Sequence, residues 1–315
     1  MRVLWIILVA LLGLLLVAAL WLWTPDKKRT ELQQTYFSAA SELLEVGGTQ
    51  LHLRDEGPKD APVVVMIHGF GSSLHTWEGW AQGLSQSYRV ISLDLPGSGL
   101  SPPDAQNDYR DQRVIGLLLQ LLDAKGIETA SLVGNSIGGR IAWRTAAAHP
   151  ERVTSLVLVA PDGFASPGFA YGEAPKVSPL LSVMRYALPR FLLRSNLVSS
   201  YGDPELLSAE TVDRYHDLML APGSRGALLE RLRQTVLSDP VPALKTIEIP
   251  VLLIWGDKDK LIPVRNAEDY LDVLVDARLA RFADLGHVPQ EEAPERSLQP
   301  VSAFLAEVTG QDQYR

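Results

Sequence analysis

One short stretch, residues 130–140, holds a serine in a setting that suits nucleophilic chemistry. A β-type run ends near Gly134, and a helix-forming run begins directly after Ser136. Gly134 and Gly138 supply the G-x-S-x-G spacing, and a serine on such a sharp strand-to-helix turn needs neighbours almost without side chains. The unpaired N–H groups at the start of a helix also suit a developing oxyanion. The stretch therefore predicts a nucleophile elbow with Ser136 as the nucleophile.

A serine hydroxyl is a poor nucleophile unless a base lies within hydrogen-bond reach, so the histidines are the next candidates. His287 follows the last predicted strand and is flanked by Gly286 and Pro289. His68 also follows a predicted strand and is its competitor. The other histidines are expected in surface strands, in helices or in the capping turn of a helix: His52, His75, His149 and His216. We predict that His287 is the base.

Three aspartates are candidates for the acid that would orient the base. Asp257 and Asp259 follow the apolar run 251–255, and Asp162 follows the apolar run 153–159. With any of the three, the chain order is serine, aspartate, histidine. That order differs from the orders found in chymotrypsin and subtilisin.

The elements that must position these side chains are predicted as alternating strands and helices after a hairpin. The hairpin is expected at 41–57, strands at 63–67, 89–93, 130–134, 153–159, 251–255 and 278–282, and helices at 111–125, 137–148, 265–275 and 294–308. Such alternation implies a mainly parallel sheet with helices on both faces, with ligands bound beyond the carboxyl ends of its strands. Residues from about 162 to 246 interrupt the alternation with proline-punctuated apolar segments, which predict an inserted helical cap.

Length and composition fit one large globular domain. The chain has 315 residues, of which 46% are hydrophobic and 21% charged, and its formal net charge is −8. The acidic balance argues against nucleic acid as a partner. The chain contains no cysteine, which excludes disulfides, thiolate catalysis and cysteine-ligated metal sites but leaves the compartment open. No metal or organic cofactor is expected.

The N-terminal segment is predicted to be separate from the catalytic domain. Residues 3–23 contain no charged residue, and at the rise of an α-helix they are long enough to cross a bilayer. We predict an uncleaved single-pass transmembrane anchor over residues 1–24, a juxtamembrane linker or short helix over 25–41 and the catalytic domain over 42–315. A cleaved signal peptide is the alternative, and the side of the membrane stays open.

These features together resemble the α/β-hydrolase family, over about residues 43–308. The matching motifs are His-Gly-Phe-Gly at 68–71, Asp-Leu-Pro-Gly-Ser-Gly-Leu-Ser at 94–101, Gly-Asn-Ser-Ile-Gly-Gly at 134–139, Trp-Gly-Asp-Lys-Asp at 255–259 and Gly-His-Val-Pro at 286–289. The resemblance implies an α/β-hydrolase fold, in which a mainly parallel, doubly wound sheet carries a helical cap. It also implies a catalytic triad of serine, aspartate and histidine.

The resemblance selects the acid among the three aspartates. The G-x-x-D pattern after the strand matches Asp259, which would hold the tautomer of His287 and stabilise its imidazolium. Asp162 stands where some family members place the acid and ranks second, and Asp257 ranks last. The implied triad is Ser136, Asp259 and His287.

The resemblance further implies an oxyanion hole made by the backbone N–H groups of Phe70 and Ile137. His68 and Gly69 would support the first of these loops, His68 by hydrogen bonding. A large apolar residue such as Phe70 is similar to the type found in relatives that take medium or long acyl chains.

The implied activity is hydrolysis of a carboxylic ester through an acyl-enzyme on Ser136, similar to that of membrane-anchored esterases and monoacylglycerol lipases. The anchor and the apolar cap favour lipid-like or acylglycerol esters, so the expected partners are a small-molecule or lipid ester and the membrane. One alternative is a hydrolase of C–C bonds in meta-cleavage products, which Asn135 favours and Val288 disfavours because those relatives carry an aromatic residue there. A lactone hydrolase is another, and a non-catalytic membrane adaptor on a hydrolase scaffold is the remoter one.

Overall fold

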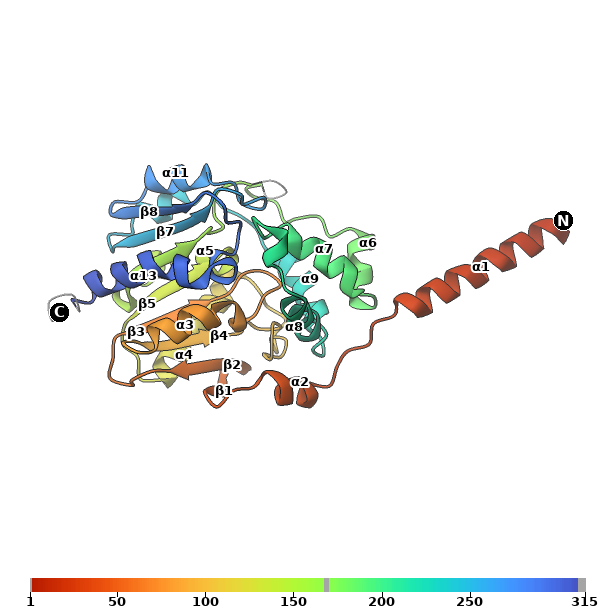
Figure 1. Ribbon diagram of the computed structural model, residues 1–315, viewed down its shortest axis with the longest axis horizontal. Coiled ribbons are helices and arrows are strands. Elements are labelled where there is room, and N and C mark those ends of the chain that lie inside the picture. Colours follow the sequence, from red (N-terminus) through yellow and green to blue (C-terminus); the bar gives the residue numbers. More distant parts are fainter. Residues whose placement is uncertain (1, 167–169, 311–315) are drawn as a thin grey trace.

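A computed structural model of the chain describes residues 2–166 and 170–310, apart from the side chains of residues 15, 16, 18 and 19. Within this part, one sheet has the strand order β1-β2-β4-β3-β5-β6-β7-β8 (Figure 1). The strands are β1 (Ser41–Val46), β2 (Thr49–Glu56), β3 (Val63–Ile67), β4 (Arg89–Leu93), β5 (Ala130–Asn135), β6 (Val153–Val159), β7 (Val251–Gly256) and β8 (Ala277–Phe282).

The strands from β3 to β8 run parallel to one another, whereas β1 and β2 pair antiparallel at one edge. A parallel strand is covered on both faces and therefore reads as a continuous apolar run. This explains why the runs in β3, β6 and β7 could be recognised from composition alone. The predictions of a mainly parallel α/β sheet and of a hairpin at 41–57 are confirmed.

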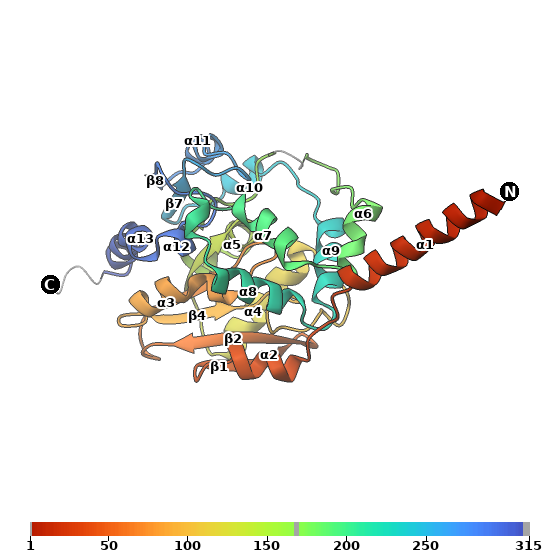
Figure 2. The same cartoon turned by 45° about the vertical axis from the view of Figure 1, so that its right-hand side comes forward.

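Helices cover both faces of this sheet (Figure 2). The described α-helices are α1 (Arg2–Leu22), α2 (Arg29–Tyr36), α3 (Glu78–Leu84), α4 (Asp111–Ala124), α5 (Ile137–Ala148), α6 (Pro179–Ser182), α7 (Arg190–Val198), α8 (Ala209–Met219), α9 (Ser224–Gln234), α10 (Val241–Leu244), α11 (Asn266–Leu271), α12 (Pro289–Glu292) and α13 (Pro294–Val308). Short 3-10 helices are η1 (Leu74–Trp77), η2 (Pro150–Arg152), η3 (Val183–Arg185) and η4 (Pro204–Leu206).

The alternation of side chains along β3 divides the core into two layers. Val65 and Ile67 pack with residues of α4 and α5, whereas Val64 and Met66 pack with residues of α3 and α13. Successive side chains of a strand point to opposite faces, so one short apolar strand contributes to both layers. The loops at the carboxyl ends of these strands are consequently held against a rigid, dry centre.

The residues between β6 and β7, 160–250, hold helices α6 to α10 and are called the cap below. Figure 1 shows α6, α7, α8 and α9 gathered at one end of the sheet. Apolar side chains of the cap lie both inside it and on its surface. Leu193 is buried, whereas Leu180, Phe191 and Leu192 are exposed. The cap therefore presents apolar side chains outward as well as inward.

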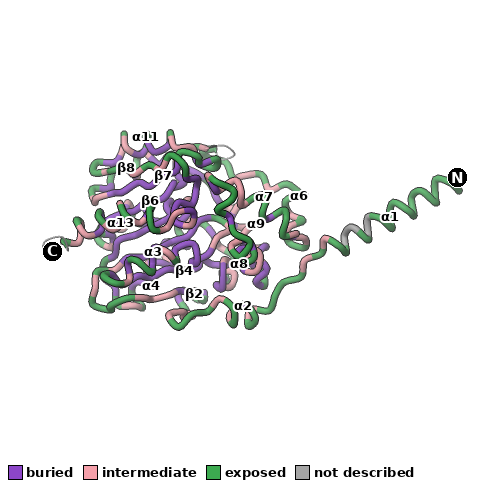
Figure 3. Tube along the Cα trace, viewed as in Figure 1, coloured by how far each residue is buried: buried purple, intermediate pink, exposed green. Residues whose placement is uncertain are grey.

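The N-terminal helix α1 projects away from the domain, and its described side chains are almost all exposed (Figure 3). No helix in the described part of the chain combines the length and the hydropathy that crossing a membrane requires. The prediction of a transmembrane anchor over residues 1–24 is therefore not supported.

Residues 23–37, which follow α1, are docked on the domain and are called the strap below. The Thr24 N–H donates to the carbonyl of Tyr186 at 2.9 Å, and the Lys27 N–H donates to the carbonyl of Leu220 at 2.9 Å, so both bonds reach the cap. Arg29 donates from Nη1 to the carbonyl of Leu100 at 2.6 Å, on the loop that follows β4. Most of the predicted linker 25–41 is thus an ordered element that joins the cap to the sheet.

Candidate active site

Ser136 lies on a strained turn between β5 and α5. Its backbone has φ 55° and ψ −119°, and a positive φ is uncommon for a residue other than glycine. A Cβ atom at Gly134 would lie 2.3 Å from the carbonyl oxygen of Gly138, and a Cβ atom at Gly138 would lie 2.1 Å from the carbonyl oxygen of Ile67. Both glycines are therefore required for the turn, which places Ser136 between the end of β5 and the start of α5.

His287 and Asp259 form a buried pair in two loops that follow neighbouring strands. Nδ1 of His287 lies 2.7 Å from Oδ2 of Asp259, and both residues are at most 9% exposed. The other oxygen of Asp259 accepts hydrogen bonds from the backbone N–H groups of Leu261 at 2.8 Å and Ile262 at 2.9 Å. A carboxylate fixed in this way accepts the Nδ1 proton, which leaves Nε2 of His287 as the atom able to take a proton from a nucleophile.

Asn135 joins the His287 loop to the elbow. Its Nδ2 donates to the carbonyl of His287 at 3.0 Å and to the carbonyl of Val159 at 3.1 Å. The N–H of His287 is also held, by the carbonyl of Ser200 at 2.7 Å. Among the described residues, the hydroxyl of Ser136 makes no hydrogen bond to the ring of His287. Catalytic hydrogen bonds of this kind are often long without a substrate and shorten when the substrate binds.

The other two candidate acids are engaged elsewhere. Asp162 is buried in an ion pair with Arg140, and burial raises its pKa although Arg140 acts in the opposite direction. Asp257 accepts from Nε of Arg281 at 2.9 Å near the surface. Of the three aspartates, the structure brings Asp259 into contact with the His287 ring.

The loop after β3 carries the predicted oxyanion donor Phe70. Nδ1 of His68 donates to the carbonyl of Gly69 at 2.7 Å, and Nε2 of His68 accepts from the N–H of Leu95 at 3.0 Å. Burial lowers the pKa of His68 to about 4, so the ring is neutral at neutral pH. A neutral ring can serve both bonds at once, because it has one donor and one acceptor nitrogen.

The second predicted donor, the N–H of Ile137, belongs to the first turn of α5. The N–H groups of a first helical turn have no partner within their helix, and this turn follows Ser136 directly. Phe70 lies inside a tight turn that is closed by a 3.3 Å hydrogen bond from the Ser72 N–H to the Gly69 carbonyl, with Gly71 at φ +67°.

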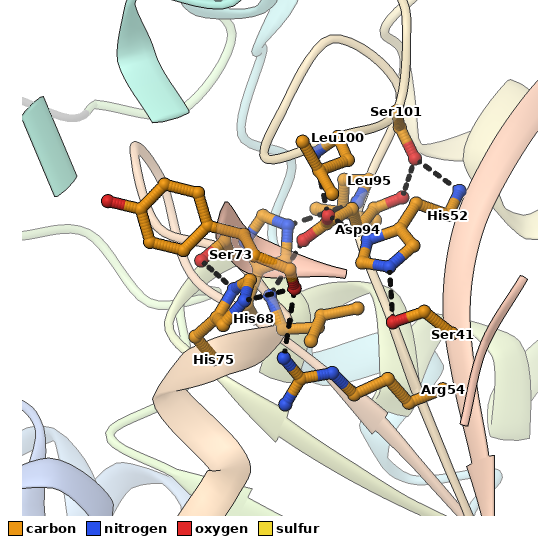
Figure 4. A network of polar contacts seen from close by, with 12 residues as sticks. Ser41, His52, Arg54, His68, Ser73, His75, Asp94, Leu95, Leu100 and Ser101 are labelled. Atoms are coloured by element: carbon orange, nitrogen blue, oxygen red, sulfur yellow. Dashed lines mark hydrogen bonds and ion pairs between the residues drawn. The ribbon is translucent and has the colours of Figure 1, made fainter. Parts of the chain in front are cut away.

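Asp94 is the centre of a buried polar network beside this loop (Figure 4). Its carboxylate oxygens lie 2.7 Å from Nδ1 of His52, 2.7 Å from the Leu74 N–H and 2.8 Å from the Leu100 N–H. Burial acts to raise the pKa of Asp94, but the hydrogen bond and the charge of His52 outweigh it and hold the pKa at about 2. The network pins η1 and the loop after β4 to the edge of the sheet.

The structure corrects the expectation for His52 and places His75 in the turn η1 directly before α3. His52, expected at the surface of a strand, is fully buried against Asp94. His75, expected in a capping turn, is buried as well: its Nδ1 lies 3.1 Å from Oγ of Ser73 and its Nε2 lies 3.4 Å from the carbonyl of Tyr36. Burial lowers the pKa of His75 to about 4. Asp94 pairs with His52 from 42 residues away, whereas His75 has both a local partner in Ser73 and a distant one in Tyr36.

Two glutamates of α12 were not anticipated as parts of the site. Glu292 accepts from the N–H groups of Gly286 and Gly202, both at 2.7 Å, and so fixes the backbone directly before His287. Glu291 accepts from hydroxyl and guanidinium groups of the cap. The sequence signal was their position just after Pro289, in the first turn of a short helix.

In the part of the chain that the structure describes, no cluster of three or more histidine, aspartate or glutamate side chains could hold a metal ion. The arrangement at the strand ends consists instead of a strained serine, a histidine oriented by a carboxylate, and two sets of backbone N–H groups. Such a set suits acyl transfer.

Comparison with known proteins agrees with this geometry. Residues 62–294 match the alpha/beta hydrolase fold family. The chain belongs to the α/β-hydrolase family. The predicted resemblance and the α/β-hydrolase fold are thereby confirmed, and the protein is a hydrolase of this family.

Relatives of this α/β-hydrolase include several activities. The dihydrolipoyllysine-residue acetyltransferase component of an acetoin cleaving system from Pseudomonas putida is 31% identical over 84% of this chain and 69% of its own length. The 2-hydroxymuconate semialdehyde hydrolase of Pseudomonas sp. (strain CF600) is 32% identical over 82% of this chain and 92% of its own. The crystal structure of a membrane phospholipase A that is a bacterial virulence factor has a TM-score of 0.72 at 27% identity, covering 98% of this chain and 99% of that one.

Proposed function

We propose that the protein is a serine hydrolase of carboxylic esters that acts through an acyl-enzyme on Ser136. The observation that carries the proposal is the buried 2.7 Å contact between His287 and Asp259, in a loop that Asn135 ties to the strained turn of Ser136. His287 is the base, and Asp259 orients it and stabilises the imidazolium. No metal or organic cofactor takes part.

In the first half-reaction, Nε2 of His287 takes the hydroxyl proton as Oγ of Ser136 attacks the ester carbonyl. The oxyanion accepts hydrogen bonds from the N–H groups of Phe70 and Ile137, and His287 then protonates the leaving alcohol. In the second half-reaction, His287 takes a proton from water as the water oxygen attacks the acyl carbonyl. His287 then returns the proton to Oγ of Ser136 as the acid leaves. His68 supports the turn of Phe70 throughout.

Labelling with a fluorophosphonate tests this proposal and separates it from a non-catalytic adaptor. The probe forms a covalent bond with a serine that an adjacent base activates. We expect stoichiometric labelling at Ser136, which mass spectrometry of the digested protein locates, and no labelling of Ser136→Ala. An unlabelled wild-type protein that remains folded would favour the adaptor.

We further propose that the substrate is a lipid-like ester, such as an acylglycerol, met at a membrane surface. Support comes from the exposed apolar side chains of α1 and of the cap, among them Leu4, Leu180 and Phe191. Figures 1 and 2 show α1, α6 and α7 on the same side of the domain, and the ring of Trp23 stacks on that of Tyr186 at 6.0 Å. The similarity to a membrane phospholipase A agrees with this proposal.

Removal of residues 1–22 tests the membrane part of the proposal. The truncation keeps the strap, whose bonds begin at Thr24. We expect kcat/KM for a short soluble p-nitrophenyl ester to stay within about twofold, while hydrolysis of lipid in vesicles falls by roughly tenfold or more because the local concentration of substrate is lost. Equal activity of both forms on vesicles would contradict a role of α1 in lipid access.

Hydrolysis of a C–C bond is the second candidate, because a 2-hydroxymuconate semialdehyde hydrolase is among the relatives. Asn135 does not discriminate here, since both of its described hydrogen bonds go to backbone carbonyls. Kinetics with a p-nitrophenyl ester series and with a ring-cleavage product decide between the two. We expect a kcat/KM at least about 100-fold higher for the preferred ester.

A further inference from the structure

The turn that carries the Phe70 N–H has a second support, which comes from the cap. The hydroxyl of Ser72, the last residue of the turn, lies 3.0 Å from the phenolic oxygen of Tyr215 in α8. Tyr215 is only 8% exposed, so water competes little for this bond. His68 holds the turn at its first residue, and Tyr215 holds it at its last.

The direction of this hydrogen bond follows from the other partner of Tyr215. The phenolic oxygen also lies 3.2 and 3.3 Å from the two carboxylate oxygens of Glu291. An ionised carboxylate only accepts hydrogen bonds, so Tyr215 donates its proton to Glu291 and its oxygen accepts the proton of Ser72. Burial and the charge of Glu291 raise the pKa of Tyr215, which keeps the phenol protonated.

Glu291 connects this chain of bonds to the base. It lies in α12, four residues after His287, and its carboxylate is fixed by Nη2 of Arg214 at 3.0 Å and by the hydroxyl of Tyr201 at 2.7 Å. Its neighbour Gln290 donates from Nε2 to the hydroxyl of Thr76 at 3.0 Å. The helix that follows the base is therefore tied to η1 by Gln290 and, through Tyr215 of the cap, to Ser72 of the oxyanion turn.

We propose that Tyr215 is a positioning residue, which couples the seating of the cap to the geometry of the oxyanion hole. With α8 in place, the chain Ser72, Tyr215, Glu291 fixes the turn so that the Phe70 N–H points at the developing oxyanion. Without the phenolic hydroxyl, the Ser72 side chain loses its bond to the cap, and the turn keeps its backbone bond to Gly69 and the support of His68. This inference rests on the proposed function, because it assumes that Phe70 donates to an oxyanion.

The structure offers a matched control for this role in Tyr201. Tyr201 and Tyr215 are both buried tyrosines whose hydroxyls donate to Glu291. Of these two, Tyr215 alone also contacts Ser72. Replacing either by phenylalanine removes one hydroxyl and its contact with the Glu291 carboxylate, but only Tyr215→Phe also removes the link to Ser72.

The experiment measures kcat, KM and the inhibition constant of a trifluoromethyl ketone, which forms an oxyanion in the site. Loss of a whole oxyanion donor costs about 100- to 1000-fold in kcat, and a donor that is only misplaced should cost less. We expect Tyr215→Phe to lower kcat by about tenfold and weaken the ketone by a similar factor, with KM within about twofold. Tyr201→Phe loosens Glu291 but keeps the bond between Tyr215 and Ser72, so it should lower kcat and weaken the ketone by clearly smaller factors than Tyr215→Phe.

Ser72→Ala provides a second variant and tests the connection itself. We expect it to reproduce the loss in kcat, and the double variant Ser72→Ala/Tyr215→Phe to lose no more than either single variant, because both remove the same link. Equal losses in Tyr215→Phe and Tyr201→Phe, or a rise in KM with kcat unchanged, would overturn the proposal. Fluorophosphonate labelling of Ser136 in each variant is read separately, so failure of the proposed function would appear there.

Discussion

The loops at the strand ends and the elements that lie over them are held in different ways. His287 and Asp259 are at most 9% exposed, and their contact is surrounded by backbone hydrogen bonds of the sheet loops. The cap, in contrast, leaves Leu180 82% exposed and Phe191 59% exposed. The strap is bound to the cap partly by the ion pair of Lys27 with Asp217 at 2.6 Å, at a partly exposed position.

This difference indicates which parts of the site can move. Strained backbone and buried hydrogen bonds hold a group in one arrangement, because leaving it exposes unpaired polar atoms. Partly exposed ion pairs contribute little to stability and are screened by salt. We therefore expect the histidine and aspartate to be preformed, and the cap and strap to adjust when a substrate enters.

The largest effect is expected from the nucleophile and the base. Ser136→Ala or His287→Ala should lower kcat on a p-nitrophenyl ester by about four to six orders of magnitude, because the two groups act as a unit. Both variants should keep the melting temperature of the wild type within a few degrees. Near-normal turnover in either variant would show that the preformed part of the site is not catalytic.

The acid should come next, and the three aspartates give an internal control. Asp259→Asn should lower kcat by about 100- to 10,000-fold, because the amide no longer fixes the tautomer of His287. Asp257→Asn, which loses only a bond to Arg281 near the surface, should stay within about twofold. Asp162→Asn should act mainly on stability, since it leaves the buried charge of Arg140 with one carboxylate partner fewer.

The buried histidine of the oxyanion loop predicts how stability depends on pH. The folded state holds the pKa of His68 at about 4, whereas an unfolded histidine titrates near 6.5. The contribution of His68 to the free energy of unfolding is therefore full above pH 6.5 and falls as the pH drops toward 4, because the unfolded chain binds the proton first. Between pH 7 and pH 5 the loss from His68 should be about 2 kcal/mol.

Chemical denaturation of His68→Gln at both pH values checks this expectation. The variant should show a pH dependence smaller by about 2 kcal/mol, while His149→Gln, at a partly exposed helix end, should behave as the wild type. The same dependence in all three proteins would mean that His68 is not the group that titrates.

The smallest effect is expected where the strap meets the cap. Removing residues 1–37 instead of 1–22 deletes the bonds of Thr24, Lys27 and Arg29, and it also deletes the Tyr36 carbonyl beside His75 and the Phe37 ring that stacks on His52. We expect kcat/KM on a soluble ester to fall by about three- to tenfold relative to the shorter truncation, because the cap is less well seated. Identical kinetics of the two truncations would show that the strap only rests on the cap.

The sequence by itself was enough to predict the sheet and the residues of the proposed triad. Apolar runs, turn residues and the glycine spacing around Ser136 are local signals, and the structure follows them in β3, β5, β6 and β7 and in the end of α13 at Val308. The order of Ser136, Asp259 and His287 along the chain can be read directly. Because all three follow predicted strands, the expectation that they approach one another required only the parallel topology.

Contacts between distant segments could be decided only in three dimensions. His52 looked like a surface residue because its strand alternates polar and apolar, but Asp94 and Phe37 cover that face. The strap was predicted as a linker or short helix because it mixes polar and apolar residues, although the partners of Lys27 and Arg29 lie about 190 residues away in the cap. The local pattern does not signal such partners, because the same polar residue type in the same pattern can be either buried and paired or exposed to solvent. Only the folded arrangement determines which of them is desolvated and paired.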